Sequence, residues 1–210
     1  MLEDFTYCCL SRLNTFVCRI MYGVRPFAKS PLPAEGPALV VCDHTSLGDP
    51  LVLLATAGRP IRFMMAEEIY SKSHAQWIFQ AFRCVPIRRG ERDVQAVRAM
   101  LKGLADNEVM GLFPEGGLGR HRIDEGHPGI GYLAIKSGAP VIPASISWEK
   151  PRPISFMVKT LLVPCKVKIN YGEPLQYPQE PRPSKEAMEV CTKEIMSRIE
   201  DLRKTGENQT

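Results

Sequence analysis

Short apolar segments, each about the length of one β-strand, alternate with helix-like segments along most of this 210-residue chain. The apolar segments cover 38–42, 61–66, 84–87, 109–113 and 141–147. Helical patterns follow or separate them at 51–57, 67–82, 93–106 and 129–137. Strands that alternate with helices favour βαβ units and parallel pairing. The sequence therefore predicts an α/β fold with a mostly parallel central sheet flanked by helices.

The ends of the chain carry additional predicted elements. An amphipathic helix is expected over 5–22, followed by a proline-containing linker, so we divide the chain into 1–30 and a single main domain over 31–210. The apolar face of this helix comprises Phe5, Cys9, Leu13, Phe16, Val17, Ile20 and Met21. Such a face either packs on its own domain or lies in a membrane interface. Two extended segments, 154–162 and 166–171, and a final helix capped by Ser184 complete the chain.

Composition excludes several classes of protein. The net charge of +4 includes no run of like charges typical of a nucleic-acid-binding arm. The seven cysteines are scattered without zinc-ligand spacing, so we expect no metal site and reduced thiols in a cytosolic protein. An apolar stretch of about 18 residues, long enough for a membrane span, is absent, and the N-terminus lacks the features of a signal peptide.

The strongest candidate for catalysis follows the segment 38–42. His44 and Asp49 form a His-x-x-x-x-Asp pattern, directly before Pro50. An imidazole can act as a general base near neutral pH when a carboxylate holds its other ring nitrogen. Asp49 is also expected at the N-cap of the helix that begins at Pro50, because Asp before Pro is a common helix start. The two roles are compatible, since a carboxylate has two oxygens.

Two further turns after predicted strands carry unusual polar residues. Arg88 and Arg89 follow the segment 84–87, and Glu115 and Gly116 follow 109–113. Turns that follow parallel strands gather at one edge of the sheet, where sites form. An exposed basic turn and an ordinary Pro-Glu-Gly turn are the structural alternatives.

Four blocks in this order resemble the glycerolipid acyltransferase family, which contains the lysophosphatidic acid acyltransferases. The blocks are 43–50 (DHTSLGDP), 85–90 (VPIRRG), 113–116 (FPEG) and 138–146 (GAPVIPASI). Two departures stand out. The family's Thr-Arg-Ser after the third block is replaced by Gly117-Leu118-Gly119, so that Arg120 or Arg122 would have to substitute for the usual arginine. Asp43 stands where the family often has Asn.

The resemblance implies transfer of a fatty acyl group from acyl-CoA or acyl-carrier protein to the free hydroxyl of a lysophospholipid, foremost 1-acylglycerol-3-phosphate. His44 would be the general base and Asp49 its orienting carboxylate. Residues implied in binding the acceptor and its phosphate are Arg88, Arg89, Glu115, Gly116, Gly117 and Arg120. No cofactor is expected beyond the acyl-donor substrate, and the expected location is the cytosolic face of a membrane.

Two alternatives remain open at this point. The missing arginine motivates an acyltransferase with a different lysolipid acceptor, such as an amino-acid lipid. The altered third block also allows a lipid-binding module without catalytic activity. Intact His44 and Asp49 argue against that second alternative.

Overall fold

The computed structural model describes residues 2–24, 30–72, 74, 76–88, 93–114, 129–148, 164 and 166–207. The strands are β1 (Ala38–Cys42), β2 (Ile61–Ala66), β3 (Val85–Ile87), β4 (Val109–Leu112), β5 (Val141–Trp148) and β6 (Val167–Tyr171). The helices are α1 (Leu2–Tyr22), α2 (Asp49–Thr56), α3 (Glu67–Lys72), α4 (Gln76–Ala81), α5 (Val94–Ala105), α6 (Gly129–Ser137) and α8 (Lys185–Glu207). The extended segment predicted at 154–162 lies outside the described residues.

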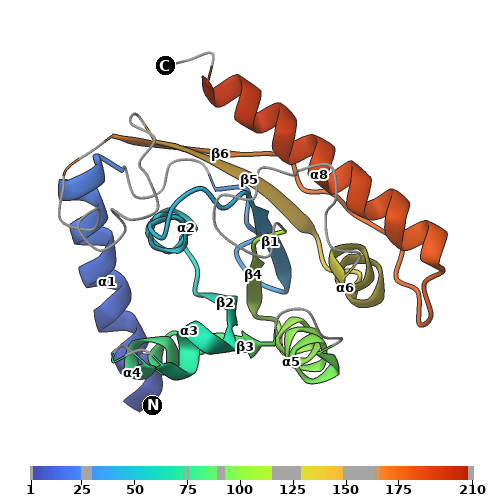
Figure 1. Ribbon diagram of the computed structural model, residues 1–210, viewed down its shortest axis with the longest axis horizontal. Coiled ribbons are helices and arrows are strands. Elements are labelled where there is room, and N and C mark those ends of the chain that lie inside the picture. Colours follow the sequence, from blue (N-terminus) through green and yellow to red (C-terminus); the bar gives the residue numbers. More distant parts are fainter. Residues whose placement is uncertain are drawn as a thin grey trace.

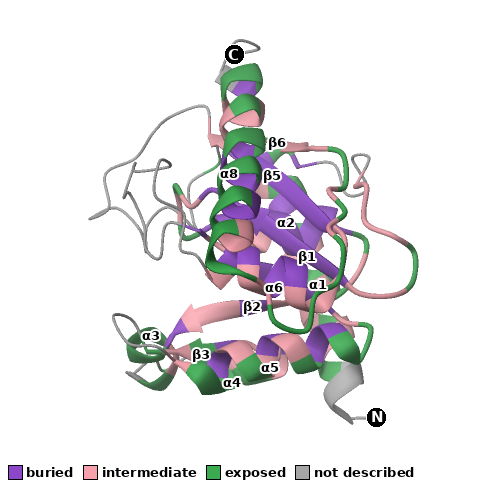
Figure 2. Cartoon of the chain, turned by 90° about the vertical axis from the view of Figure 1, so that its right-hand side faces the viewer, coloured by how far each residue is buried: buried purple, intermediate pink, exposed green. Residues whose placement is uncertain are grey.

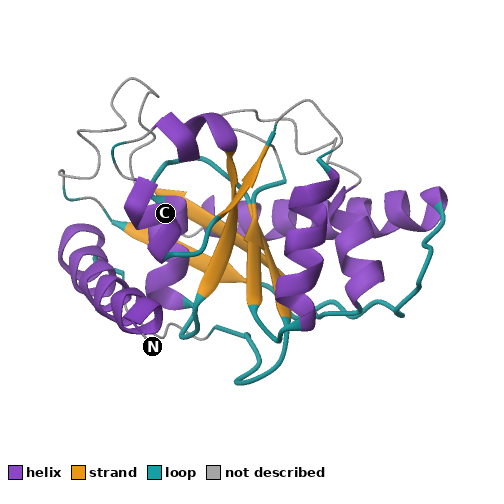
Figure 3. Ribbon diagram, turned by 90° about the horizontal axis from the view of Figure 1, so that it is seen from below, coloured by secondary structure: helices purple, strands orange, loops and turns teal. Residues whose placement is uncertain are grey.

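The six strands form one sheet in the order β3-β2-β4-β1-β5-β6. The β3–β2, β2–β4, β4–β1 and β1–β5 pairs are parallel, and the β5–β6 pair is antiparallel. Helices cover both faces, with α1 and α2 on one side and α5, α6 and α8 on the other (Figures 1 and 3). The predicted α/β class with a mostly parallel sheet is confirmed.

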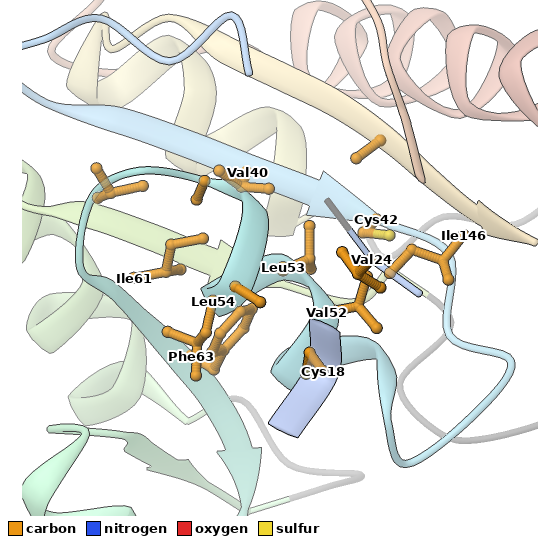
Figure 4. Close-up of a cluster of buried hydrophobic side chains, with 14 of the residues drawn as sticks. Cys18, Val24, Val40, Cys42, Val52, Leu53, Leu54, Ile61, Phe63 and Ile146 are labelled. Carbon is orange, nitrogen blue, oxygen red and sulfur yellow. The ribbon is translucent and has the colours of Figure 1, made fainter. Parts of the chain in front are cut away.

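Strand β1 lies in the centre of the sheet and is completely buried. Its alternate side chains supply two separate cores, because successive residues of a strand point to opposite faces. Val40 and Cys42 pack with α1 and α2, as Figure 4 shows, whereas Leu39 and Val41 pack with α5, α6 and α8. Burial on both faces, shown in Figure 2, holds β1 in a fixed position. The turn with His44 begins directly after its last residue, Cys42.

The helix predicted over 67–82 is divided into α3 and α4 around position 74. Residues 71–74 read Ser-Lys-Ser-His, a stretch without apolar side chains for packing. Serine hydroxyls also compete with helical hydrogen bonds, which disfavours a helix interior. The predicted helix starts at Asp93 and Ser184 are confirmed: Asp93 accepts hydrogen bonds from two α5 amides, and Ser184 accepts one from Ala187.

Helix α1 packs on its own domain mainly through side chains that lie outside the apolar face identified in the sequence. Cys18 and Tyr22 are buried in the core, and Asn14 donates a 2.9 Å hydrogen bond to the carbonyl of Leu51 in α2. Side chains of the predicted apolar face point outward instead: Leu13 is 59% exposed, Phe16 62%, Val17 39% and Ile20 60%. One face of α1 therefore packs on the domain, and another exposes apolar side chains. Within the described residues, no helix has the length and apolar character needed to span a membrane.

Gly131 of α6 lies in tight contact with α8, and we expect Gly131→Ala to destabilise the fold. A Cβ atom at this position would lie 2.2 Å from the backbone oxygen of Met188 and 2.8 Å from Oγ1 of Thr192. Overpacking of this kind costs about 1–3 kcal/mol, measurable by urea unfolding. Gly129→Ala on the same helix is the matched control, because nothing lies within 4 Å of its added Cβ. Equal stability of the two variants would contradict the tight crossing.

Candidate active site

The candidate site lies where three neighbouring strands end. Strand β1 is hydrogen-bonded to β4 on one side and β5 on the other, and all three run parallel. His44 follows β1, Phe113 follows β4 and Trp148 is the last residue of β5. The carboxyl edge of parallel strands is the usual position of sites in such sheets. Residues far apart in the sequence thus meet around one turn.

His44 and Asp49 form the predicted pair. Nδ1 of His44 lies 3.0 Å from Oδ2 of Asp49, with the imidazole 13% exposed and the carboxylate completely buried. An ionised carboxylate only accepts hydrogen bonds, so Nδ1 carries the ring proton and the lone pair lies on Nε2. The pair therefore presents a basic nitrogen whose orientation is fixed by a buried anion. This arrangement suits proton abstraction from a bound hydroxyl group.

Asp49 fixes the preceding turn rather than capping the helix. The expected N-cap position belongs to Gly48, and Asp49 is the first residue of α2. Its Oδ2 accepts hydrogen bonds from the backbone N–H groups of Thr45 (2.8 Å) and Ser46 (2.7 Å) as well as contacting His44. The N-cap prediction was wrong because this carboxylate points back toward the turn. One oxygen thus orders both the backbone and the imidazole.

Phe113 covers one face of the imidazole, a role that the sequence did not reveal. The two rings are stacked with centroids 4.1 Å apart and an interplanar angle of 21°, and Phe63 stacks on Phe113 from β2 at 5.7 Å. This aromatic support restricts tilting of the His44 ring. Phe113 opens the third sequence block, but its contact with His44 depends on β4 lying beside β1, which the sequence does not specify.

Asp43 is a second buried carboxyl group beside His44, at 2% exposure. Oδ2 accepts a hydrogen bond from the Ser145 hydroxyl (3.1 Å), and Oδ1 accepts one from the Ile146 N–H (3.0 Å), both on β5. The pKa of Asp43 is raised from 3.8 to about 6, mainly because the group is buried. The nearby charge of Asp49 contributes to this rise. Asp43 therefore ties the His44 turn to β5.

Of the predicted substrate-binding residues, Arg88 alone lies within the described part of the chain. Arg88 follows β3 and is exposed, with Nε 3.8 Å from Oε2 of Glu67 and 3.7 Å from Oδ2 of Asp93. Strand β3 lies three positions from β1, so its end is roughly 14 Å from the His44 turn at the usual strand spacing. The remaining predicted binding residues lie outside the described part of the chain: Arg89, Glu115, Gly116, Gly117 and Arg120.

The described ranges contain no group of three or more His, Cys, Asp or Glu residues arranged to hold a metal ion. The cysteines described at 8, 9, 18, 42, 84 and 191 are free. Burial raises the pKa of the Cys84 thiol to about 11, and it has the same effect at Cys191, so both thiols are protonated at neutral pH. We assign no nucleophilic role to either thiol.

Comparison with known proteins shows the family of this chain. The family described as Acyltransferase matches residues 26–147, more than half of the chain. The chain is therefore an enzyme of the glycerolipid acyltransferase family. A 1-acyl-sn-glycerol-3-phosphate acyltransferase of Bacillus subtilis (strain 168) is 25% identical over 185 residues, which cover 86% of this chain and 88% of that protein.

A solved structure shares the fold. The crystal structure of the 1-acyl-sn-glycerophosphate (LPA) acyltransferase PlsC from Thermotoga maritima superposes with a TM-score of 0.65 at 19% identity. The match covers 96% of this chain and 81% of that chain. This structural similarity covers more of the chain than the family match over residues 26–147.

Proposed function

We propose that this enzyme transfers a fatty acyl group from a thioester, acyl-CoA or acyl-carrier protein, to the free hydroxyl of 1-acylglycerol-3-phosphate. The observation that carries the proposal is the His44–Asp49 pair, held at 3.0 Å at the carboxyl edge of the central strand. The name of the Bacillus relative, which covers most of the chain, supports the choice of acceptor.

In the proposed reaction, His44 acts as the general base. Nε2 takes the proton from the acceptor hydroxyl as its oxygen attacks the thioester carbonyl carbon. The new C–O bond forms, the C–S bond breaks, and the proton passes to the sulfur to give a free thiol. Asp49 stabilises the imidazolium that forms transiently, because its buried carboxylate contacts Nδ1. No acyl-enzyme is required in this direct transfer.

The acceptor phosphate requires a cationic partner. Arg89 is our first choice, because a guanidinium group binds phosphate oxygens through two hydrogen bonds. Arg88 is the second choice, since the structure places its side chain near the carboxylates of Glu67 and Asp93. Glu115, Gly116, Gly117 and Arg120 complete the acceptor site in this proposal.

A thiol-release assay tests the proposed function directly. Purified enzyme is mixed with palmitoyl-CoA and a thiol-reactive dye, with and without 1-acylglycerol-3-phosphate. We expect release of CoA to depend on the lysolipid and the product to be the diacyl lipid. Absence of turnover with this acceptor and with a panel of other lysolipids, using either acyl-CoA or acyl-carrier protein, would contradict acyl transfer to lysolipids.

A second acceptor class follows from a specific sequence feature. Gly117-Leu118-Gly119 replaces the family's Thr-Arg-Ser, so one expected phosphate-binding arginine is missing. An amino-acid lysolipid, which needs no phosphate anchor, is the alternative acceptor. The same assay separates the two acceptors, because strict preference for 1-acylglycerol-3-phosphate excludes the alternative.

We further propose that the enzyme is peripheral on the cytosolic face of a membrane and that α1 contacts the lipid. Its outward face carries the exposed apolar side chains Leu13, Phe16, Val17 and Ile20. Arg12 and Arg19 are exposed beside this face, where guanidinium groups reach lipid headgroups. Both reaction partners carry acyl chains, so a lipid surface is where they concentrate.

The variant Phe16→Glu/Ile20→Glu is expected to lose vesicle binding while remaining folded. Burying each of these side chains in the interface contributes about 1.5–3 kcal/mol, so binding to phosphatidylglycerol vesicles should fall at least about tenfold. Co-sedimentation measures the bound fraction. Val190→Glu on α8 is the control, because Val190 is 67% exposed on the opposite side of the sheet. Unchanged binding by the double variant would contradict the role of α1.

A further inference from the structure

Trp148 occupies the one Asp49 oxygen that His44 does not contact. Its indole Nε1–H donates a 2.8 Å hydrogen bond to Oδ1 of Asp49. The other oxygen, Oδ2, serves His44 and the two backbone N–H groups of the turn. A donor on each side of the carboxylate fixes its plane, and the plane of the carboxylate in turn directs the Nδ1 contact.

The indole is itself held from two sides. Its ring lies against Gly48, where an added Cβ would come within 2.5 Å of Cη2 of Trp148. On another side, Tyr22 at the end of α1 packs edge-to-face, with ring centroids 5.2 Å apart and an interplanar angle of 80°. The indole thus has little freedom to turn away from Asp49. Gly48 leaves the space that the ring fills.

We propose that Trp148 is a positioning residue for acyl transfer, acting through Asp49 by its indole N–H. The proposal rests on the role of His44 and Asp49 in the proposed function. Trp148 lies just beyond the residues that match the family, and none of the four sequence blocks includes it. A carboxylate that loses this donor can rotate and so change the orientation of the His44 imidazole. Small displacements of a general base greatly reduce the reaction rate.

The variants Trp148→Phe and Trp148→Leu separate the hydrogen bond from the packing. Both remove the N–H group, whereas only phenylalanine retains an aromatic ring against Tyr22. We expect kcat to fall roughly 10- to 100-fold in both variants, as for loss of one charge-assisted hydrogen bond, with KM for palmitoyl-CoA within about twofold. Trp77→Phe is the matched control, because this tryptophan is 58% exposed on α4. Wild-type kcat in Trp148→Phe would overturn the proposal, and so would a loss seen only in Trp148→Leu.

A spectroscopic measurement tests the hydrogen bond without altering Trp148. The chain has two tryptophans, so Trp77→Phe leaves Trp148 as the only source of an indole signal in a ¹H–¹⁵N spectrum. We expect this signal to shift when Asp49→Asn replaces the anionic acceptor and to stay in place with the exposed control Asp201→Asn. An indole signal that does not respond to Asp49→Asn overturns the proposal.

Failure of the proposed function gives a different result. If wild-type enzyme releases no thiol, or if His44→Ala keeps full turnover, then the acyl-transfer mechanism is wrong and the role of Trp148 falls with it. If His44→Ala abolishes turnover while Trp148→Phe retains it, then only the role of Trp148 is wrong.

Discussion

His44→Ala is expected to reduce kcat by about 10²–10⁴-fold, which corresponds to roughly 3–5 kcal/mol of transition-state stabilisation. The loss follows from removing the basic nitrogen that Asp49 orients at the carboxyl edge of β1. Binding of both substrates uses other groups, so their KM values should change little. Thiol release from palmitoyl-CoA in the presence of 1-acylglycerol-3-phosphate measures the effect.

His74→Ala provides the control for this variant, because His74 lies in an exposed turn between α3 and α4. The fold should survive the loss of His44, since its imidazole sits at a turn and the strand before it is buried independently. Thermal unfolding checks this point. An active and folded His44→Ala enzyme would assign the general base to another residue and contradict the mechanism.

The part of the site that follows from the sequence is the part built from neighbouring residues. His44 and Asp49 belong to one turn, so a strand end and a spacing suffice to predict their contact. The partners across the sheet are different. Phe113 and Trp148 reach the turn only because β1 pairs with β4 and β5, an order that alternating strands and helices do not specify.

Helix α1 shows a second limit of pattern reasoning. Its largest apolar side chains, such as Phe16 and Ile20, define one face, and that face is exposed. The buried face depends on Asn14, Cys18 and Tyr22, which form hydrogen bonds and aromatic contacts that a hydropathy pattern does not weigh. Periodicity therefore predicted the helix, but it did not decide which of its faces packs on the domain.

Asp49 fits the sequence patterns of a helix N-cap and of a partner for His44, but in the structure it has only the second role. Its position before Pro50 is typical of an N-cap, yet the carboxylate accepts from Thr45 and Ser46 in the turn before the helix. The oxygen that accepts these two hydrogen bonds, Oδ2, is also the one that contacts Nδ1 of His44. A single buried carboxylate thus serves both the turn and the imidazole.

Asp43→Asn is expected to stabilise the folded enzyme at neutral pH by up to about 3 kcal/mol. The pKa of Asp43 is raised from 3.8 to about 6 because the group is buried. Between these two values the folded state binds more protons than the unfolded state, so stability falls as pH rises from about 4 to about 6 and then levels off. A difference of about two pKa units corresponds to roughly 3 kcal/mol.

Asparagine removes this penalty while keeping the contacts of Asp43. Its amide oxygen can accept from the Ile146 N–H, and its amide nitrogen can donate to the Ser145 hydroxyl oxygen. Urea unfolding at pH 4 and at pH 7.5 should therefore show a gain at the higher pH and little change at the lower. Asp201→Asn removes the same charge at an exposed position of α8 and should leave both values unchanged. If Asp43→Asn destabilised the enzyme equally at both pH values, then the buried carboxyl group would be a net stabilising contact between the His44 turn and β5.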